Sequence, residues 1–308
     1  GGVPREGLCA DAVTLRRCLQ ATGAGEPTVV DTPCSVGESC QSTAQGAVCV
    51  PVAGGCVPGS SECSDSVTRR LCDATGQWQT TVCGEGCVLG ALGARCVSAV
   101  ATAPWSGTLR YAYRAWDWAV TGWSSSTSQA AAQAVLVLSL RGDELVDATV
   151  SAADGSFTVQ LPADFTPATD RLVFALIATH ADGSLAFAVA RPDVPVGSWV
   201  VTQAPPAESS TFWSWSVDPS VVASGSTILI GEAQGSAAVR VFDWARYAVR
   251  QSESWFGKDG QSVLLWLAPE VTYSCGSCFT PWAAVVQGQA FASQIWLPAS
   301  SVEQRYWS

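Results

Sequence analysis

The sequence of 308 residues contains no methionine and no asparagine, and it has only one lysine and one histidine. Without asparagine the chain has no acceptor for N-linked glycosylation. The single histidine, His180, excludes an H-E-x-x-H helix within this sequence, because such a helix supplies two zinc-binding histidines. The missing initiator methionine indicates a chain that is processed, trimmed or excerpted from a longer product.

Long apolar runs and positive charge are also scarce. The longest apolar run, residues 130–140, is interrupted by Gln133 and Ser139 and is shorter than the roughly 20 residues of a membrane helix. The net charge of −10 opposes binding to nucleic acid, which requires clustered lysine and arginine. We therefore predict no nucleic-acid partner and no transmembrane segment. Arginine in place of lysine, with abundant alanine, glycine and valine, is typical of a GC-rich bacterial genome.

Cysteine, by contrast, is abundant and concentrated in the first 96 residues. Residues 56–96 are rich in glycine and serine between their cysteines, so this segment has too little apolar surface to fold without cross-links. Because disulfides persist only in oxidising surroundings, we predict an exported bacterial protein, extracellular or on the outer cell surface. The disulfide candidates are Cys9, Cys18, Cys34, Cys40, Cys49, Cys56, Cys63, Cys72, Cys83, Cys87, Cys96, Cys275 and Cys278.

The cysteine-rich region contains a repeat. The stretch from Cys9 to Cys18 resembles the stretch from Cys63 to Cys72, and an Ala-Thr-Gly sequence follows each. Self-similarity of this kind indicates two copies of one unit. We predict two disulfide-rich modules, residues 1–54 and 55–98, which serve either as a rigid spacer or in protein recognition. The later cysteines correspond in order, Cys34, Cys40 and Cys49 to Cys83, Cys87 and Cys96.

The first module lacks a counterpart of Cys56, whose position would fall at or just before Gly1. One interpretation is that an upstream segment carried a sixth cysteine. The other is a lipid-modified cysteine before Gly1, as in many bacterial lipoproteins, which would anchor the N-terminus and leave one odd thiol. The sequence alone leaves the disulfide pairing open.

After a linker of small residues, 99–106, apolar and polar residues alternate, which is the pattern of strands with one buried face. The Asp-Gly-Ser sequences at 154–156 and 182–184 predict tight turns between such strands. We predict an antiparallel β-sandwich over residues 107–203, with strands near 109–113, 135–140, 157–161, 172–177, 185–189 and 194–201.

Three short sequences in this segment resemble a known family. They are Gly107-Thr-Leu-Arg-Tyr111, Ala134-Val-Leu-Val137 and Ala153-Asp-Gly-Ser-Phe-Thr-Val-Gln-Leu-Pro162, and they resemble the transthyretin-like, carboxypeptidase-regulatory-type β-sandwich. That resemblance implies an accessory module of a secreted bacterial protein.

A second linker, residues 204–210, precedes a mixed segment, residues 211–308. Apolar residues at intervals of three and four predict a helix at about 235–252, with Tyr247 and Ala248 on its apolar face. We predict an α+β lobe, which we interpret as an incomplete domain because the chain stops on an aromatic run. Its expected strands lie at 212–215, 227–230, 263–267, 283–287 and 291–297.

This segment carries a second resemblance. The helix sequence Val241-Phe-Asp-Trp-Ala-Arg-Tyr-Ala-Val249, the next strand and the extended Ser293-Gln-Ile-Trp-Leu297 resemble the N-terminal lobe of a gluzincin zinc metallopeptidase. The closing sequence from Val302 to Ser308 resembles the approach to the zinc-binding helix in myxobacterial secreted members. The resemblance implies that zinc and the catalytic half lie beyond Ser308, and that this chain holds no catalytic residue, metal site or cofactor.

Other candidate chemistry is limited. His180 is either a catalytic or metal-binding residue or, as we favour, a solvated residue beside a turn. Cys275-x-x-Cys278 is either a redox pair or, as the flanking prolines favour, a local structural disulfide in a loop. A calcium site lacks the alternating acidic spacing that it needs, so a solvated loop is favoured for Asp143, Glu144 and Asp147.

The aromatic clusters offer the best candidate for binding. Flat indole faces suit sugar rings, and tryptophan dominates the energetics of protein interfaces. These clusters either bind glycan, protein partners or neighbouring copies of the chain, or they pack the sandwich against the lobe. The residues are Trp116, Trp118, Trp123, Phe212, Trp213 and Trp215.

We therefore expect a mainly β, multidomain fold with one prominent helix. The leading functional hypothesis is the non-catalytic N-terminal portion of an exported zinc metallopeptidase, whose modules tether the enzyme or present substrate. The alternative is a cell-surface structural or adhesive protein that self-associates or binds glycan through tryptophan-rich surfaces.

Overall fold

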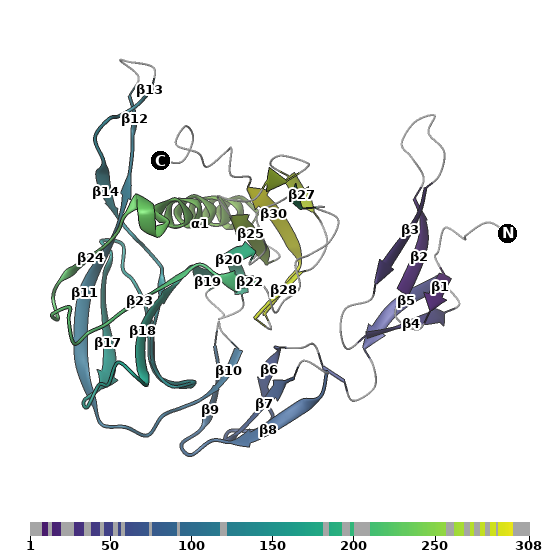
Figure 1. Ribbon diagram of the computed structural model, residues 1–308, viewed down its shortest axis with the longest axis horizontal. Coiled ribbons are helices and arrows are strands. Elements are labelled where there is room, and N and C mark those ends of the chain that lie inside the picture. The colour runs from purple at the N-terminus through teal and green to yellow at the C-terminus, as the bar shows by residue number, and fades with distance from the viewer. Residues whose placement is uncertain are drawn as a thin grey trace. The chain divides into compact units, whose positions relative to one another are not determined.

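The computed structural model divides the chain into two units, Gly1–Glu62 with Arg70–Thr81, and Cys63–Arg69 with Val82–Ser308. Figure 1 labels the helix and the strands. The structure describes residues 8–11, 14–19, 28–33, 38–43, 46–51, 55–56, 59–73, 76–90, 93–117, 122–180, 185–192, 198–199, 210–256, 262–267, 272–273, 278–280, 284–287 and 289–297. These residues are mostly in β-strands, and their one α-helix is α1 (Ser236–Phe256). The predicted mainly β, multidomain fold is confirmed, together with the single prominent helix.

The two cysteine-rich segments have the same order of strands. The first contains the antiparallel sheet β1 (Leu8–Asp11), β2 (Thr14–Leu19) and β3 (Thr28–Pro33), followed by the hairpin β4 (Glu38–Thr43) and β5 (Gly46–Pro51). The second contains the sheet β6 (Ser61–Cys63), β7 (Thr68–Cys72) and β8 (Trp78–Val82), followed by the hairpin β9 (Cys87–Gly90) and β10 (Gly93–Cys96). The border between the two units passes through β6, β7 and β8.

The long strand β11 (Thr102–Tyr113) organises the first sheet of the sandwich. Its first half pairs with β17 (Ser156–Pro162), its second half pairs with β14 (Ser128–Ala131), and β24 (Thr227–Ile230) runs parallel to it. The partner changes at Leu109, whose N–H donates to Gly155 and whose carbonyl accepts from Ala132. Gly155 has a φ of 83° in the predicted Asp-Gly-Ser turn, a conformation that glycine adopts without strain.

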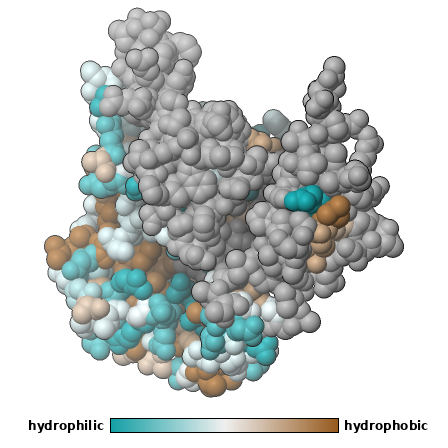
Figure 2. Space-filling view, turned by 45° about the vertical axis from the view of Figure 1, so that its right-hand side comes forward, coloured by the Kyte–Doolittle hydropathy of each residue, from teal (hydrophilic) through white to brown (hydrophobic). Residues whose placement is uncertain are grey.

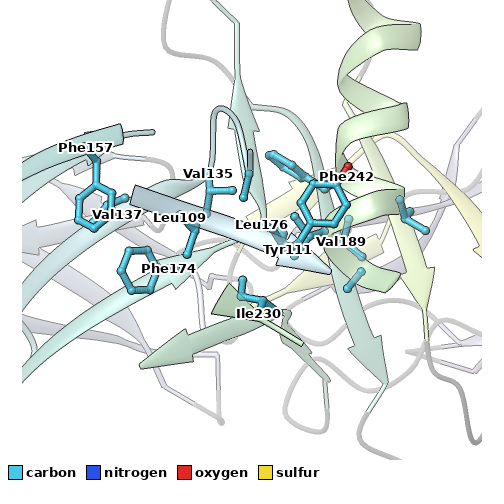
Figure 3. Close-up of a cluster of buried hydrophobic side chains, with 14 of the residues drawn as sticks. Leu109, Tyr111, Val135, Val137, Phe157, Phe174, Leu176, Val189, Ile230 and Phe242 are labelled. Carbon is cyan, nitrogen blue, oxygen red and sulfur yellow. The ribbon is translucent and has the colours of Figure 1, made fainter. Parts of the chain in front are cut away.

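The second sheet has the strand order β16 (Glu144–Val150), β15 (Leu136–Arg141), β18 (Asp170–Ala175) and β23 (Ser214–Val217). Burial alternates along β11 and β17, as the period-two pattern predicts, whereas β15 is buried over consecutive residues. Phe157 of β17 meets Phe174 of β18 edge to face, with ring centroids 5.3 Å apart. Figure 3 shows these rings with Leu109 and Val137 in the shared hydrophobic core.

A third, mixed sheet continues from the sandwich. Its strand order is β19 (Ile177–Thr179), β20 (Leu185–Pro192), β25 (Val263–Leu267), β30 (Ser293–Leu297) and β27 (Cys278–Thr280), and β22 (Ser210–Phe212) also pairs with β20. Strands β20, β25 and β30 are parallel, and β27 at the edge is antiparallel. Three short ladders complete the described strands: β12 (Trp116–Asp117) with β13 (Gly122–Trp123), β21 (Ser198–Trp199) with β26 (Thr272–Tyr273), and β28 (Ala284–Val286) with β29 (Gln289–Phe291).

Both faces of the mixed sheet are buried, as parallel strands require. On one face α1 packs its apolar side against β20, with Phe242 and Phe187 ring centroids 5.0 Å apart. On the other face Trp266 and Trp296 stack at 5.2 Å, and Phe291 joins the same cluster. This explains why β25 reads as a continuous apolar run rather than an alternating one.

Two continuous chain segments run between the second sheet and the third sheet. The strand β18 runs through Leu176 into β19, and β22 runs through Trp213 into β23. Leu176 donates its N–H to Trp213, Val189 of β20 donates to Leu176, and Trp213 donates to Val189, all with N···O distances of 3.0 Å. The predicted segments 107–203 and 211–308 therefore interleave, because β20 of the first pairs with β25 of the second and β18 pairs with β23.

Candidate functional site

Four disulfides link eight of the predicted cysteine candidates. The pairs are Cys9–Cys40, Cys56–Cys72, Cys63–Cys87 and Cys83–Cys96. These bonds indicate an oxidising environment. The side chains of Cys18, Cys34, Cys49, Cys275 and Cys278 lie outside the part of the chain that the structure describes, so the predicted Cys275–Cys278 pair stays a prediction.

The two modules share both pairing and register. The pair Cys9–Cys40 corresponds to Cys63–Cys87 in the aligned repeat. Cys40 of β4 lies opposite Cys49 of β5, and Cys87 of β9 lies opposite Cys96 of β10 in the same register. The repeat in the sequence is therefore also a repeat in structure.

The aromatic residues after the second linker pack against the core. Phe212 is 4% exposed, which corrects its assignment to a binding surface, since β22 turns it toward Phe291 at 6.1 Å. Trp213 and Trp215 are half-buried, and their indole N–H groups donate to the carbonyls of Leu267 (2.9 Å) and Gln234 (2.7 Å). These tryptophans join the ends of β25 and of the 3₁₀ turn η2 (Glu232–Gln234) to the sandwich.

The other predicted tryptophans lie on a separate hairpin. The backbone of Trp116 in β12 pairs with the backbone of Trp123 in the antiparallel strand β13. The side chains of both residues, and Trp118 as a whole, lie outside the described residues. Their role in binding stays a prediction.

The outer face of α1 carries exposed aromatic residues that the sequence pattern missed. Trp244 is 55% exposed, Tyr247 58% and Trp255 73%. Of the residues that the spacing predicts on the apolar face, Tyr247 and Ala248 are exposed, whereas the others pack inward: Ala238, Val241, Phe242, Ala245 and Val249. A shallow pocket of about 440 Å³ is lined by Asp243, Trp244, Arg246 and Tyr247. On the described part of the surface that Figure 2 shows, hydrophobic and hydrophilic residues intermingle.

Below this pocket a polar network joins α1 to β11. Asp243 accepts from Arg246 at 2.7 Å and from the hydroxyl of Tyr111 at 3.4 Å. Burial, followed by the charge of Asp243, raises the pKa of Tyr111 to about 12. Arg240 lies over the ring of Tyr113, 4.5 Å from its centroid. A carboxylate, a guanidinium and aromatic rings in one shallow pocket are groups that can bind polar, ring-shaped ligands.

His180 is buried, which corrects its assignment as a solvated turn residue. It is 8% exposed, and its Nδ1 lies 2.8 Å from Oε1 of Glu253 near the end of α1. The pair joins the end of β19 to the helix. Because two sequence-distant elements meet here, no local sequence pattern reveals the contact.

The acidic group near residue 145 does not converge on one point. Asp143 lies in the turn after β15, and Asp147 of β16 accepts from the backbone N–H of Gln160 (2.7 Å). Among the described residues no three histidine, cysteine, aspartate or glutamate side chains are placed to hold a metal ion.

Comparisons of the chain with family models, with curated proteins and with solved structures found no match. Within the described residues no helix combines the length and the apolar character needed to cross a membrane. The functional argument therefore depends on the geometry above.

Proposed function

We propose that this chain is the non-catalytic N-terminal portion of an exported zinc metallopeptidase of the gluzincin type. The observation that supports this proposal is the mixed sheet, in which α1 precedes the parallel strands β25 and β30 and an antiparallel strand, β27, forms the edge. The resemblance described above expects a helix, a strand and an extended segment in this order before the zinc-binding helix.

In this proposal the sheet is a scaffold for a catalytic half that follows it. Strand β30 is internal: it pairs along its whole length with β25 and at residues 294–296 with β27, and Trp296 is fully buried against Trp266. A strand held this firmly gives a fixed starting point for the next element, which is what a zinc-binding helix needs for a precise ligand geometry. The disulfide modules and the sandwich then act as a stable tether outside the cell.

The test begins with the full-length gene product. If the codons after Ser308 encode H-E-x-x-H, the purified protein is expected to contain about one zinc per chain and to hydrolyse casein, with loss of both after mutation of the motif histidines. A stop codon directly after Ser308, or a full-length protein without zinc and without peptidase activity, would overturn the proposal.

A second candidate function is a cell-surface adhesive protein, and the exposed aromatic face of α1 supports it. Trp244, Tyr247 and Trp255 present their side chains to solvent from one helix. Tryptophan and tyrosine are the residues that most often dominate protein interfaces, and they also stack on sugar rings. Titration with bacterial polysaccharides, followed by tryptophan fluorescence, tests glycan binding, and sedimentation velocity tests self-association; the absence of both effects would reject this candidate.

A further inference from the structure

Two arginines meet at the turn between β15 and β16, and a third lies close by. Arg95 of β10 donates from Nη1 to the carbonyl oxygen of Asp143 at 3.1 Å. Arg171 of β18 donates from Nη2 to the carbonyl oxygen of Gly142 at 3.0 Å. Burial, followed by the charge of nearby Arg69, lowers the pKa of Arg95. All three residues belong to the same structural unit.

The negative charge at this turn does not match the positive charge. The turn itself carries two carboxylates, Asp143 and Glu144; the Oδ1 of Asp143 lies 3.8 Å from Nη2 of Arg171, and the Asp143 side chain is 83% exposed. The neighbouring Arg141 does not share this carboxylate, because it is engaged with Asp164 at 2.7 Å and Asp170 at 2.8 Å. Arg69, Arg95 and Arg171 therefore outnumber the two carboxylates of the turn, which leaves a local excess of positive charge in a chain of net charge −10.

Two buried donors at the cluster also lack acceptors. The Nε atoms of Arg69 and Arg95 are shielded from solvent, and neither has a hydrogen-bond partner among the described residues. A buried charged donor without an acceptor is unfavourable, so such groups are normally satisfied by a bound water or ion. Arg171, in contrast, has a half-exposed side chain, which leaves the cluster open to solvent on one side.

The backbone fixes this geometry. Val97, two residues after Arg95, forms a β-bridge with Leu145, and Ser98 donates its N–H to the same residue at 2.9 Å. Strand β10 therefore holds Arg95 beside the β15–β16 turn, where the hydrogen bond to the carbonyl of Asp143 orients its guanidinium group. Preorganised donors of this kind lower the entropic cost of binding.

We propose that Arg69, Arg95 and Arg171 form a binding site for one oxyanion group: a sulfate, a phosphate or a carboxylate. The planar guanidinium fork matches the paired oxygens of these groups. An oxyanion between the side chains supplies acceptors for the buried Nε–H groups and offsets the repulsion among three like charges. The group is either a free anion or a substituent of an acidic polysaccharide, and the two sources share this chemistry.

Isothermal titration of the purified chain with sodium sulfate and sodium phosphate, at ionic strength held constant with chloride, tests the site. We expect saturable binding near one anion per chain. Arg95→Gln is expected to weaken it at least about tenfold, as expected for the loss of one charge-assisted contact. Arg70→Gln is the matched control: Arg70 is the next residue of β7, but it already pairs with Glu62 at 3.4 Å, so binding is expected to stay unchanged.

Circular dichroism checks that each variant folds. If Arg95→Gln does not fold, Arg171→Gln takes its place, because Arg171 is half-exposed, and a severalfold loss of anion affinity is expected.

A parallel titration with dextran sulfate separates the two sources of the anion. Binding that is tighter than that of inorganic sulfate, and that is lost in the same variants, supports the polymer, whereas equal binding supports the free anion. No saturable binding beyond that of chloride, or equal weakening in the Arg70→Gln control, would overturn the proposal.

Discussion

The indole ring of Trp213 lies against Gly235, so close that a β-carbon at position 235 would overlap the ring. Gly235 has a φ of 88° and caps the turn η2, directly before α1 begins. The same tryptophan donates to the carbonyl of Leu267 at the end of β25. Trp213 thus positions the start of the helix relative to the mixed sheet.

Replacing Gly235 by alanine is expected to destabilise the protein by about 3 kcal/mol, because the β-carbon adds overpacking to the strain of the left-handed backbone. Gly225 is the matched control, since its φ is also 88° but a β-carbon at that position would meet no atom within 4 Å. Gly225→Ala is expected to cost only about 1 kcal/mol. Urea unfolding measures both variants, and equal losses would contradict the role of Trp213.

Asp170 is expected to make stability depend on acid pH. Its side chain is fully buried, and hydrogen bonds from Arg141 lower the pKa of this carboxyl to about 2. A carboxyl whose pKa is lower in the folded state contributes stability above its unfolded pKa of about 4 and loses it as the pH falls toward 2. Asp170→Asn is therefore expected to lower stability at pH 7 by about 3 kcal/mol and to flatten its pH dependence between pH 5 and 2.

The control for this experiment is Asp164→Asn, which removes the other carboxylate of the same arginine. Asp164 is 78% exposed, so solvent screens its pair with Arg141, and the change in stability at pH 7 is expected to be much smaller than that of Asp170→Asn. Thermal unfolding across the pH range gives both curves. If the stability of the Asp170→Asn protein depends on pH as strongly as that of the unmodified protein, the pair of Asp170 with Arg141 is not the source of the pH dependence.

The exposed face of α1 is expected to be dispensable for folding. Trp244→Ser is expected to change the free energy of unfolding by about 0.5 kcal/mol or less, because the side chain is more than half exposed. Phe242→Ala, two residues away on the buried face, is expected to cost about 3 to 5 kcal/mol. If Trp244→Ser also abolishes self-association in sedimentation velocity, the adhesive hypothesis gains support; a large loss of stability would show that Trp244 is structural.

The structural repeat predicts the remaining bonds of the first module. Cys34 is expected to pair with Cys49, as Cys83 pairs with Cys96, which leaves Cys18 as the counterpart of Cys72. Within the sequence given, Cys18 is then the odd thiol. Peptide mapping after alkylation without reduction is expected to label Cys18, and labelling of Cys34 or Cys49 would contradict the correspondence.

Local patterns predicted most of the strands but not their partners. The predicted strands at 227–230 and 263–267 coincide with β24 and β25, because short apolar runs bounded by turn residues define strands locally. That β24 lies parallel to β11 depends on contacts more than 100 residues apart in sequence, and nothing in either strand specifies them. The interleaving of the two predicted segments was missed for the same reason.

For the candidate sites, too, the sequence predicted local features but not contacts between distant segments. Composition indicated the disulfides correctly, because a glycine-rich segment without a core needs cross-links. The apolar spacing of α1 predicted its buried residues Val241 and Phe242 correctly but misplaced Tyr247, which is exposed. The arginine cluster was invisible, since Arg69, Arg95 and Arg171 come from three separate strands.

The hydrogen bonds among Leu176, Val189 and Trp213 have a mechanical consequence. Strands that cross from one sheet into the next leave no hinge between the sandwich and the mixed sheet, so the two cannot rotate as rigid bodies without breaking main-chain pairing. Any movement that accompanies ligand capture is thereby restricted to hairpins and loops at the periphery, while the frame between them stays still.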